Sequence, residues 1–130
     1  MPNETLQMLI DMLQANGPHD DPSFAAQRAR LDEQAGGAPL VDGTRCEAVR
    51  ANGVACEWVT APGARPDVVV LYLHGGGYCI GSVISHRGHA SRMSSYCRAR
   101  VLNVDYRLAP EVPFPAALDD AVAAFHWLRA

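Results

Sequence analysis

The apolar run VVVLYLH spans residues 68–74 and leads directly into three glycines, Gly75, Gly76 and Gly77. A continuous run of β-branched and apolar residues predicts a strand that is buried on both faces, as strands of parallel sheets are. The pattern continues with an expected helix over 85–99, a strand over 100–106, a proline-rich loop over 107–115 and a helix over 116–129. Strands that alternate with helices predict βαβ units and a mostly parallel sheet, so the sequence indicates the α/β class.

Two helices are expected ahead of the strands. The first has apolar residues at helical spacing, at Leu6, Leu9, Ile10 and Leu13. The second is expected to begin with Asp21 as its N-cap and Pro22 in its first turn, and to end near Ala35. Neither helix carries residues with evident chemistry. We therefore expect residues 1–40 to form an N-terminal cap and residues 41–130 to form the α/β portion.

A β-hairpin is expected between these helices and the apolar run. The pair Asn52-Gly53 lies between two extended stretches, near 44–50 and 54–60. Asn-Gly is the strongest short hairpin signal, because both turn residues tolerate a positive φ. The sheet is therefore expected to begin with two antiparallel strands.

The composition argues against several classes of protein. The chain has 130 residues, of which 48% are hydrophobic, and this is enough for one small core. Its formal net charge of −3 argues against a nucleic-acid partner, because phosphate binding requires a basic face. No apolar run approaches the roughly 20 residues that a membrane span needs, and the first residues lack the basic region of a signal peptide. We expect a cytoplasmic protein with no membrane span.

The three glycines after the apolar run allow three interpretations. Glycine permits positive φ values and the close approach of another group, so free N–H groups there could stabilise a developing negative charge, as in an oxyanion hole. The same residues could form a tight turn that binds nothing. A phosphate-binding loop is the third possibility, although neither G-x-G-x-x-G nor a G-K-[ST] ending is present. The glycines alone do not decide between these interpretations.

Two motifs taken together favour one of these three interpretations of the glycine segment. HGGGYCIGS, at 74–82, is followed by VDYRLAPEVPFPAALDDA, at 104–121. This pair resembles the hormone-sensitive-lipase-like family of α/β-hydrolases, whose members are mostly carboxylesterases. With the two N-terminal helices and the hairpin, the resemblance extends over nearly the whole chain. It implies a partial α/β-hydrolase fold and the hydrolysis of ester substrates through acyl transfer to a serine.

The resemblance implies a role for each residue of the glycine segment. Gly76 and Gly77 would donate their backbone N–H groups to an oxyanion hole. Gly75 would shape the turn, and His74 would hold the loop by hydrogen bonding. Tyr78 would line the acyl or alcohol pocket. The two N-terminal helices would form part of a lid. The loop after the second strand of the βαβ unit would be fixed by three residues: Asp105, Tyr106 and Arg107.

The nucleophilic half of such a site is absent from the sequence. None of the six serines lies in a G-x-S-x-G motif, where the family carries its nucleophile. By the resemblance, the serine, the acid and the histidine lie downstream. The chain is thus expected to be the N-terminal part of a serine carboxylesterase or lipase-like hydrolase, truncated before the nucleophile elbow. This hydrolase would act on short to medium acyl esters, and the chain alone would be inactive.

Other functions stay open at this point. The alternatives within the same fold are a small-molecule-binding, receptor-like protein and an inactive truncated relative. His86 and His89 lie three residues apart on an expected helix and could face one metal ion, but no third ligand stands at a familiar spacing. Cys79 as a nucleophile would need a histidine base, and His74 is better explained as loop support. No metal or organic cofactor is implied.

The strand over 68–74 is also expected to lack a neighbour on one side. An unpaired, apolar strand edge is a template for association with another chain. We therefore expect the isolated chain to be poorly stable and to self-associate through this edge.

Overall fold

A computed structural model describes residues 3–15 and 23–130 of the chain. In sequence order its elements are α1 (Glu4–Ala15), α2 (Phe24–Gly36), β1 (Arg45–Ala51), β2 (Val54–Thr60), β3 (Arg65–Leu73), α3 (Val83–Cys97), β4 (Ala99–Val104) and α4 (Ala116–Arg129). All the helices and strands expected from the sequence are present. The differences lie at their ends and have local causes.

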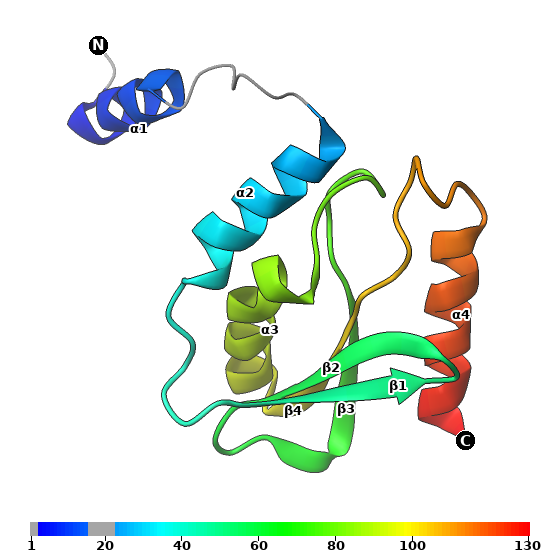
Figure 1. The fold of residues 1–130 in the computed structure, drawn as a ribbon. Helices are drawn as coiled ribbons and strands as arrows, with labels where there is room; N and C mark the ends of the chain where they lie inside the picture. The colour runs from blue at the N-terminus through cyan, green and yellow to red at the C-terminus, as the bar shows by residue number, and fades with distance from the viewer. Residues whose placement is uncertain (1–2, 16–22) are drawn as a thin grey trace.

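The four strands form one sheet in the order β1-β2-β4-β3 (Figure 1). Strands β3 and β4 are parallel, with Leu71 opposite Leu102, and α3 connects them. This confirms the expected βαβ unit. The hairpin strands β1 and β2 are antiparallel, and β2 is also antiparallel to β4. The described sheet is therefore mixed, because the hairpin adds two antiparallel pairs to the single parallel one.

The hairpin turn confirms the Asn-Gly prediction. Asn52 and Gly53 have φ values of 50° and 87°, and Ala51 pairs with Val54 across the turn. Positive φ at both central residues is what a two-residue hairpin loop of this type requires.

The two faces of the sheet carry separate apolar clusters. On the α3 face, the buried residues Val59, Ala90 and Val101 pack together. On the α4 face, the cluster includes Leu102 and Val104, the helix residue Ala124, and the rings of Trp58 and Trp127, whose centroids are 6.2 Å apart. Helices α3 and α4 therefore sandwich the sheet (Figure 1), as expected for an α/β layer structure.

The start of α2 differs from the prediction. The expected N-cap pair Asp21-Pro22 lies outside the described residues. The cap is instead Ser23, whose side chain accepts a hydrogen bond from the Ala26 N–H at 3.2 Å. Ser23 is an equally good capping residue, and it lies one residue after the proline that the prediction favoured.

Helix α3 begins and ends two residues earlier than the predicted range. The hydroxyl of Ser82 accepts hydrogen bonds from the N–H groups of Ile84 and Ser85, and the Ser85 hydroxyl accepts from the Ser82 N–H, which makes a reciprocal capping box. At the other end, Arg98 adopts a left-handed conformation with φ 49°, so the helix stops at Cys97. A left-handed arginine has no clear sequence signal, because glycine usually fills this position.

Within the part of the chain that the structure describes, no helix has both the length and the apolar character needed to cross a lipid bilayer.

Candidate functional site

The candidate site lies beyond the carboxyl ends of the parallel strands. Strand β3 ends at Leu73 and β4 ends at Val104, and a loop follows each strand. The first loop covers 74–82 and leads into α3, and the second covers 105–115 and leads into α4 (Figure 1). The Ala109 N–H donates a hydrogen bond of 2.9 Å to the Tyr78 carbonyl oxygen and joins the two loops. Ligands of open α/β sheets bind at this end of the strands.

The glycine segment has a backbone conformation that requires glycine. Gly76 has φ 130°, and a Cβ atom there would lie 2.0 Å from the Ile80 carbonyl oxygen. The Gly76 carbonyl oxygen accepts hydrogen bonds from the N–H groups of Cys79 and Ile80, both at 3.1 Å. The Gly76 and Gly77 N–H groups donate no hydrogen bond to any residue that the structure describes. The turn is thus closed by its carbonyl group, and two N–H groups stay available.

A further glycine, Gly81, was not singled out by the sequence reasoning. It has φ 97°, and a Cβ atom there would lie 2.4 Å from Nδ1 of His74 and 2.6 Å from the Gly75 carbonyl oxygen. Gly81 therefore lets the far end of the loop fold back onto its beginning. The only sequence signal for this role was a fourth glycine within seven residues.

His74 is fixed by its ring contacts and by the backbone. Its side chain is buried, and its ring stacks on Tyr106 with centroids 4.2 Å apart and planes at 13°. The Tyr106 hydroxyl donates a hydrogen bond to the His74 carbonyl oxygen, and His74 Nδ1 lies 2.9 Å from the Gly75 carbonyl oxygen. Burial, with smaller contributions from Tyr78 and Tyr72, raises the pKa of Tyr106, so its hydroxyl keeps the proton that it donates.

The histidines of α3 lie next to this stack. The ring centroids of His74 and His86 are 5.2 Å apart, and those of His86 and His89 are 5.9 Å apart. Burial, followed by His74 and His89, lowers the pKa of His86, which favours its uncharged form at neutral pH. The described residues contain no group of three or more His, Cys, Asp and Glu side chains that could hold a metal ion.

A cavity of about 720 Å³ opens beside the glycine segment. Its volume falls within the roughly 300–1,000 Å³ of typical small-molecule sites. Its lining includes His74, the three glycines and Tyr78 of the first loop, and Tyr106 of the second loop. Apolar residues of the second loop and α4 also line it, among them Val112, Phe114 and Leu118. Tyr78 has φ 62° and its side chain is largely exposed. The cavity therefore brings together every sequence-predicted residue from 74 to 78.

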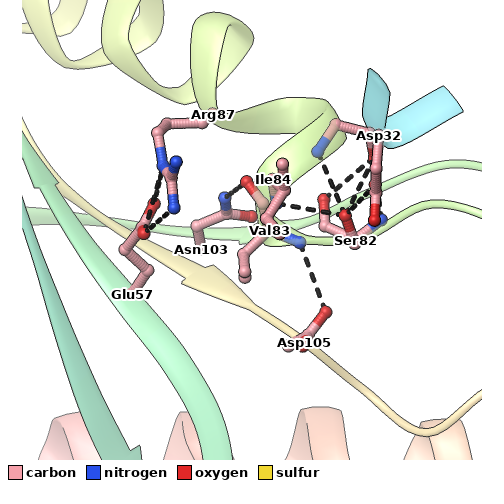
Figure 2. A network of polar contacts seen from close by, with 9 residues as sticks. Asp32, Glu57, Ser82, Val83, Ile84, Arg87, Asn103 and Asp105 are labelled. Atoms are coloured by element: carbon pink, nitrogen blue, oxygen red, sulfur yellow. Dashed lines mark hydrogen bonds and ion pairs between the residues drawn. The ribbon is translucent and has the colours of Figure 1, made fainter. Parts of the chain in front are cut away.

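The residues after β4 hold the second loop. Asp105 accepts a hydrogen bond from the Val83 N–H at 3.2 Å and so ties this loop to the start of α3 (Figure 2). The backbone N–H of Arg107 donates to Asp120 Oδ2 at 2.8 Å, and its guanidinium pairs with the same carboxylate at 2.7 Å. Burial raises the pKa of the Asp120 carboxyl, but the hydrogen bonds from Arg107 outweigh this effect and bring the pKa below its usual value.

Two residues of α2 also contact the site, and the sequence reasoning missed both. Arg28 donates hydrogen bonds to the carbonyl oxygens of Cys79 and Ala109, both at 2.7 Å. Asp32 accepts a hydrogen bond from the Ser82 hydroxyl (Figure 2). Pairs separated by about 50 to 80 residues leave no local pattern, so no signal in the sequence could have found them.

Comparison with known proteins supports the α/β-hydrolase fold. A family described as having an alpha/beta hydrolase fold matches residues 70–130. An acetyl-hydrolase from Streptomyces hygroscopicus is 49% identical over 72 residues, which cover 55% of this chain and 24% of that protein. Esterase LipI from Mycobacterium tuberculosis is 46% identical over 69 residues, which cover 53% of this chain and 22% of that protein.

Solved structures match over a longer stretch. The crystal structure of an esterase from the bacterial hormone-sensitive lipase family superimposes with a TM-score of 0.88 and 43% identity, and the match covers 99% of this chain and 44% of that one. The crystal structure of EstE5 soaked with p-nitrophenyl butyrate gives a TM-score of 0.87 and 37% identity, over 98% of this chain and 44% of that one. The chain thus spans less than half the length of the relatives that it matches. With this fold, this glycine segment and these identities, the chain has part of the α/β-hydrolase fold and is similar to esterases of the hormone-sensitive lipase family.

Proposed function

We propose that this chain supplies the oxyanion-stabilising half of a serine carboxylesterase site. The observation that carries the proposal is the pair of N–H groups on Gly76 and Gly77, which have no partner among the described residues and belong to a loop that lines an apolar cavity. Backbone N–H groups left free beside a cavity can bind a developing negative charge. The relatives named as esterases support the reaction type.

The proposed chemistry is stabilisation of a tetrahedral intermediate. When a serine attacks the ester carbonyl carbon, the carbonyl oxygen becomes an oxyanion, and two N–H groups at about 2.7–3.1 Å would donate hydrogen bonds to it and stabilise its charge. The donors would cost little reorganisation during the reaction, because the Gly76 carbonyl is already hydrogen-bonded and the loop rests on the His74–Tyr106 stack. One such donor contributes a factor of about 10²–10³ to kcat.

The cavity supports a preference for short to medium acyl esters. Its lining includes apolar side chains, among them Phe114 and Leu118, which would contact an alkyl chain. Tyr78 would line the entrance, since its side chain is exposed beside the glycines. In this proposal residues 1–40 act as a cap and residues 41–130 belong to the catalytic domain. A cytoplasmic location is part of the proposal and is tested by fractionating cells that express the gene.

The nucleophile, the acid and the catalytic histidine have no candidates in these 130 residues. No G-x-S-x-G occurs in the sequence. A partial site of this kind would bind the carbonyl oxygen without attacking the carbonyl carbon. We therefore expect the 130-residue chain to show no ester turnover by itself, and to need a polypeptide that carries the triad.

A chimera tests the proposal. Residues 1–130 replace the matching segment of a family esterase, which supplies the triad, and hydrolysis of p-nitrophenyl butyrate is measured. The proposal predicts turnover well above that of the same chimera with its nucleophilic serine changed to alanine. A folded chimera whose serine reacts with a fluorophosphonate probe, but whose ester turnover equals that of the serine-to-alanine control, would show that these residues do not stabilise the oxyanion. Ligand binding without turnover would favour the receptor-like alternative.

A further inference from the structure

Arg28, on the cap helix α2, contacts both loops that line the cavity. Its Nε donates to the Cys79 carbonyl oxygen at 2.7 Å, and one terminal nitrogen donates to the Ala109 carbonyl oxygen at 2.7 Å. The remaining donors pair with the Glu111 carboxylate at 2.9 and 3.0 Å. A guanidinium can hold several acceptors in one plane, which the single ammonium of lysine cannot do. One side chain thus joins α2, the glycine loop and the proline-rich loop.

We propose that Arg28 is a positioning residue that sets the direction of the Gly77 N–H group. This inference rests on the proposed function for its catalytic meaning, but its geometry stands on the contacts of this chain alone.

The coupling runs through two planar peptide groups. In a trans peptide the C=O and the following N–H point in opposite directions within one rigid plane. Arg28 holds the Cys79 carbonyl, so it also orients the Ile80 N–H, which donates to the Gly76 carbonyl oxygen at 3.1 Å. The Gly76 carbonyl in turn shares a peptide plane with the Gly77 N–H. Fixing the first plane therefore fixes the second, and with it the proposed oxyanion donor.

Asp32 provides a second anchor from the same helix. It lies four residues after Arg28, so both side chains lie on one face of α2. Its carboxylate accepts a hydrogen bond from the Ser82 hydroxyl, and Ser82 is the N-cap of α3 (Figure 2). Helix α2 thus holds the chain at Cys79 and again at Ser82, and the end of the glycine loop lies between these two points.

The contribution of Arg28 comes from its carbonyl contacts more than from its ion pair. The Arg28 side chain is 23% exposed, whereas that of Glu111 is 57% exposed. Solvent screens an exposed ion pair strongly, but hydrogen bonds from a charged donor to partly buried carbonyl groups are short and strong. We therefore expect loss of Arg28 to affect the loop and loss of the Glu111 charge to leave it unchanged, so the two residues can be tested independently.

The test is amide hydrogen exchange, measured by NMR on the full 130-residue chain. Arg28→Ala should speed exchange of the Ile80 amide about 10- to 100-fold, because hydrogen bonds from a charged group are lost. It should also shift the Gly77 amide resonance, while the sheet amides of Val101 and Leu102 keep their protection. Arg28→Lys should restore part of the protection. Two controls should behave as the parent chain: Glu111→Gln, which leaves the carbonyl contacts in place, and Glu33→Ala, an exposed position on the same helix.

Two results would overturn the inference. If Ile80 and Gly77 are unchanged in Arg28→Ala, the arginine does not position the loop. If the sheet amides lose protection as much as Ile80 does, Arg28 supports the fold in general and has no particular effect on the donor.

Kinetics in the chimera give a second readout. Arg28→Ala should lower kcat at an unchanged KM for p-nitrophenyl butyrate, since a misaligned donor weakens only the transition state. An unchanged kcat, or a rise in KM alone, would count against the inference. If the parent chimera has no turnover, the proposed function fails, whereas the exchange experiment still decides the role of Arg28.

Discussion

Replacing Gly76 with alanine tests the glycine loop most severely. The new Cβ atom would lie 2.0 Å from the Ile80 carbonyl oxygen, in a backbone with φ 130° that an L side chain rarely adopts. To restore an ordinary contact, the loop must move by about 1 Å or more, and a displacement of about 1 Å can cost a factor of about 10² in rate. Loss of one oxyanion donor costs about 10²–10³ in kcat, or about 3–4 kcal/mol of activation free energy. We expect Gly76→Ala to lower kcat of the chimera by about 10²–10³.

The assay compares kcat for p-nitrophenyl butyrate after titration of reactive serine, so that only folded enzyme is counted. Gly53→Ala is the matched control, because Gly53 also has a positive φ of 87° but lies at the hairpin turn with open space around its Cα. It should lose about 1–2 kcal/mol of stability from the left-handed backbone and keep its kcat. If Gly76→Ala keeps kcat within threefold of the parent, the loop geometry does not support catalysis and the reasoning is refuted.

Three further changes test contacts around the site and the edge of the sheet. Asp120→Asn should lower Tm at pH 7, because Arg107 loses its carboxylate partner. The pKa of the Asp120 carboxyl is lowered in the folded chain. The stabilising effect of the ionised carboxylate is therefore full above the ordinary aspartate pKa of about 3.9 and is lost as the pH falls. The difference in Tm between parent and variant should shrink towards pH 3, and a difference independent of pH would contradict this. Tyr106→Phe removes the hydrogen bond to the His74 carbonyl and should cost about 1 kcal/mol in urea unfolding, and no loss would mean that the ring stack alone holds the loop. Val69 is 40% exposed on the edge strand β3. Val69→Lys should therefore weaken the expected self-association of the chain, as measured by sedimentation velocity. An unchanged sedimentation profile would show that the chains do not associate through this edge.

The sequence predicts the order of the elements well because their signals are local. The apolar run before Gly75 and the Asn52-Gly53 pair specify a strand and a hairpin turn, and both are present. The element ends are less predictable. Arg98 ends α3 in a conformation that its residue type does not favour, and Ser82 caps the helix through a serine partner in place of the usual acidic one.

The site is predictable only where residues are neighbours in the chain. The segment from His74 to Tyr78 lines one cavity, and the role of Tyr78 in substrate binding stays a prediction. Arg28 was invisible because its partners lie 51 to 83 residues away. Such contacts depend on how α2 packs against α3, and tertiary packing of this kind leaves no pattern along the sequence.

The central claim is that Gly76 and Gly77 donate to the oxyanion, and a trapped intermediate tests it directly. The chimera is inactivated with an alkyl phosphonate, whose phosphonyl oxygen occupies the oxyanion position, and its crystal structure is determined. The account predicts that this oxygen lies about 2.7–3.1 Å from the N–H nitrogens of Gly76 and Gly77, with the alkyl group in the apolar cavity. A phosphonyl oxygen that contacts neither glycine, in an otherwise folded complex, would contradict the account.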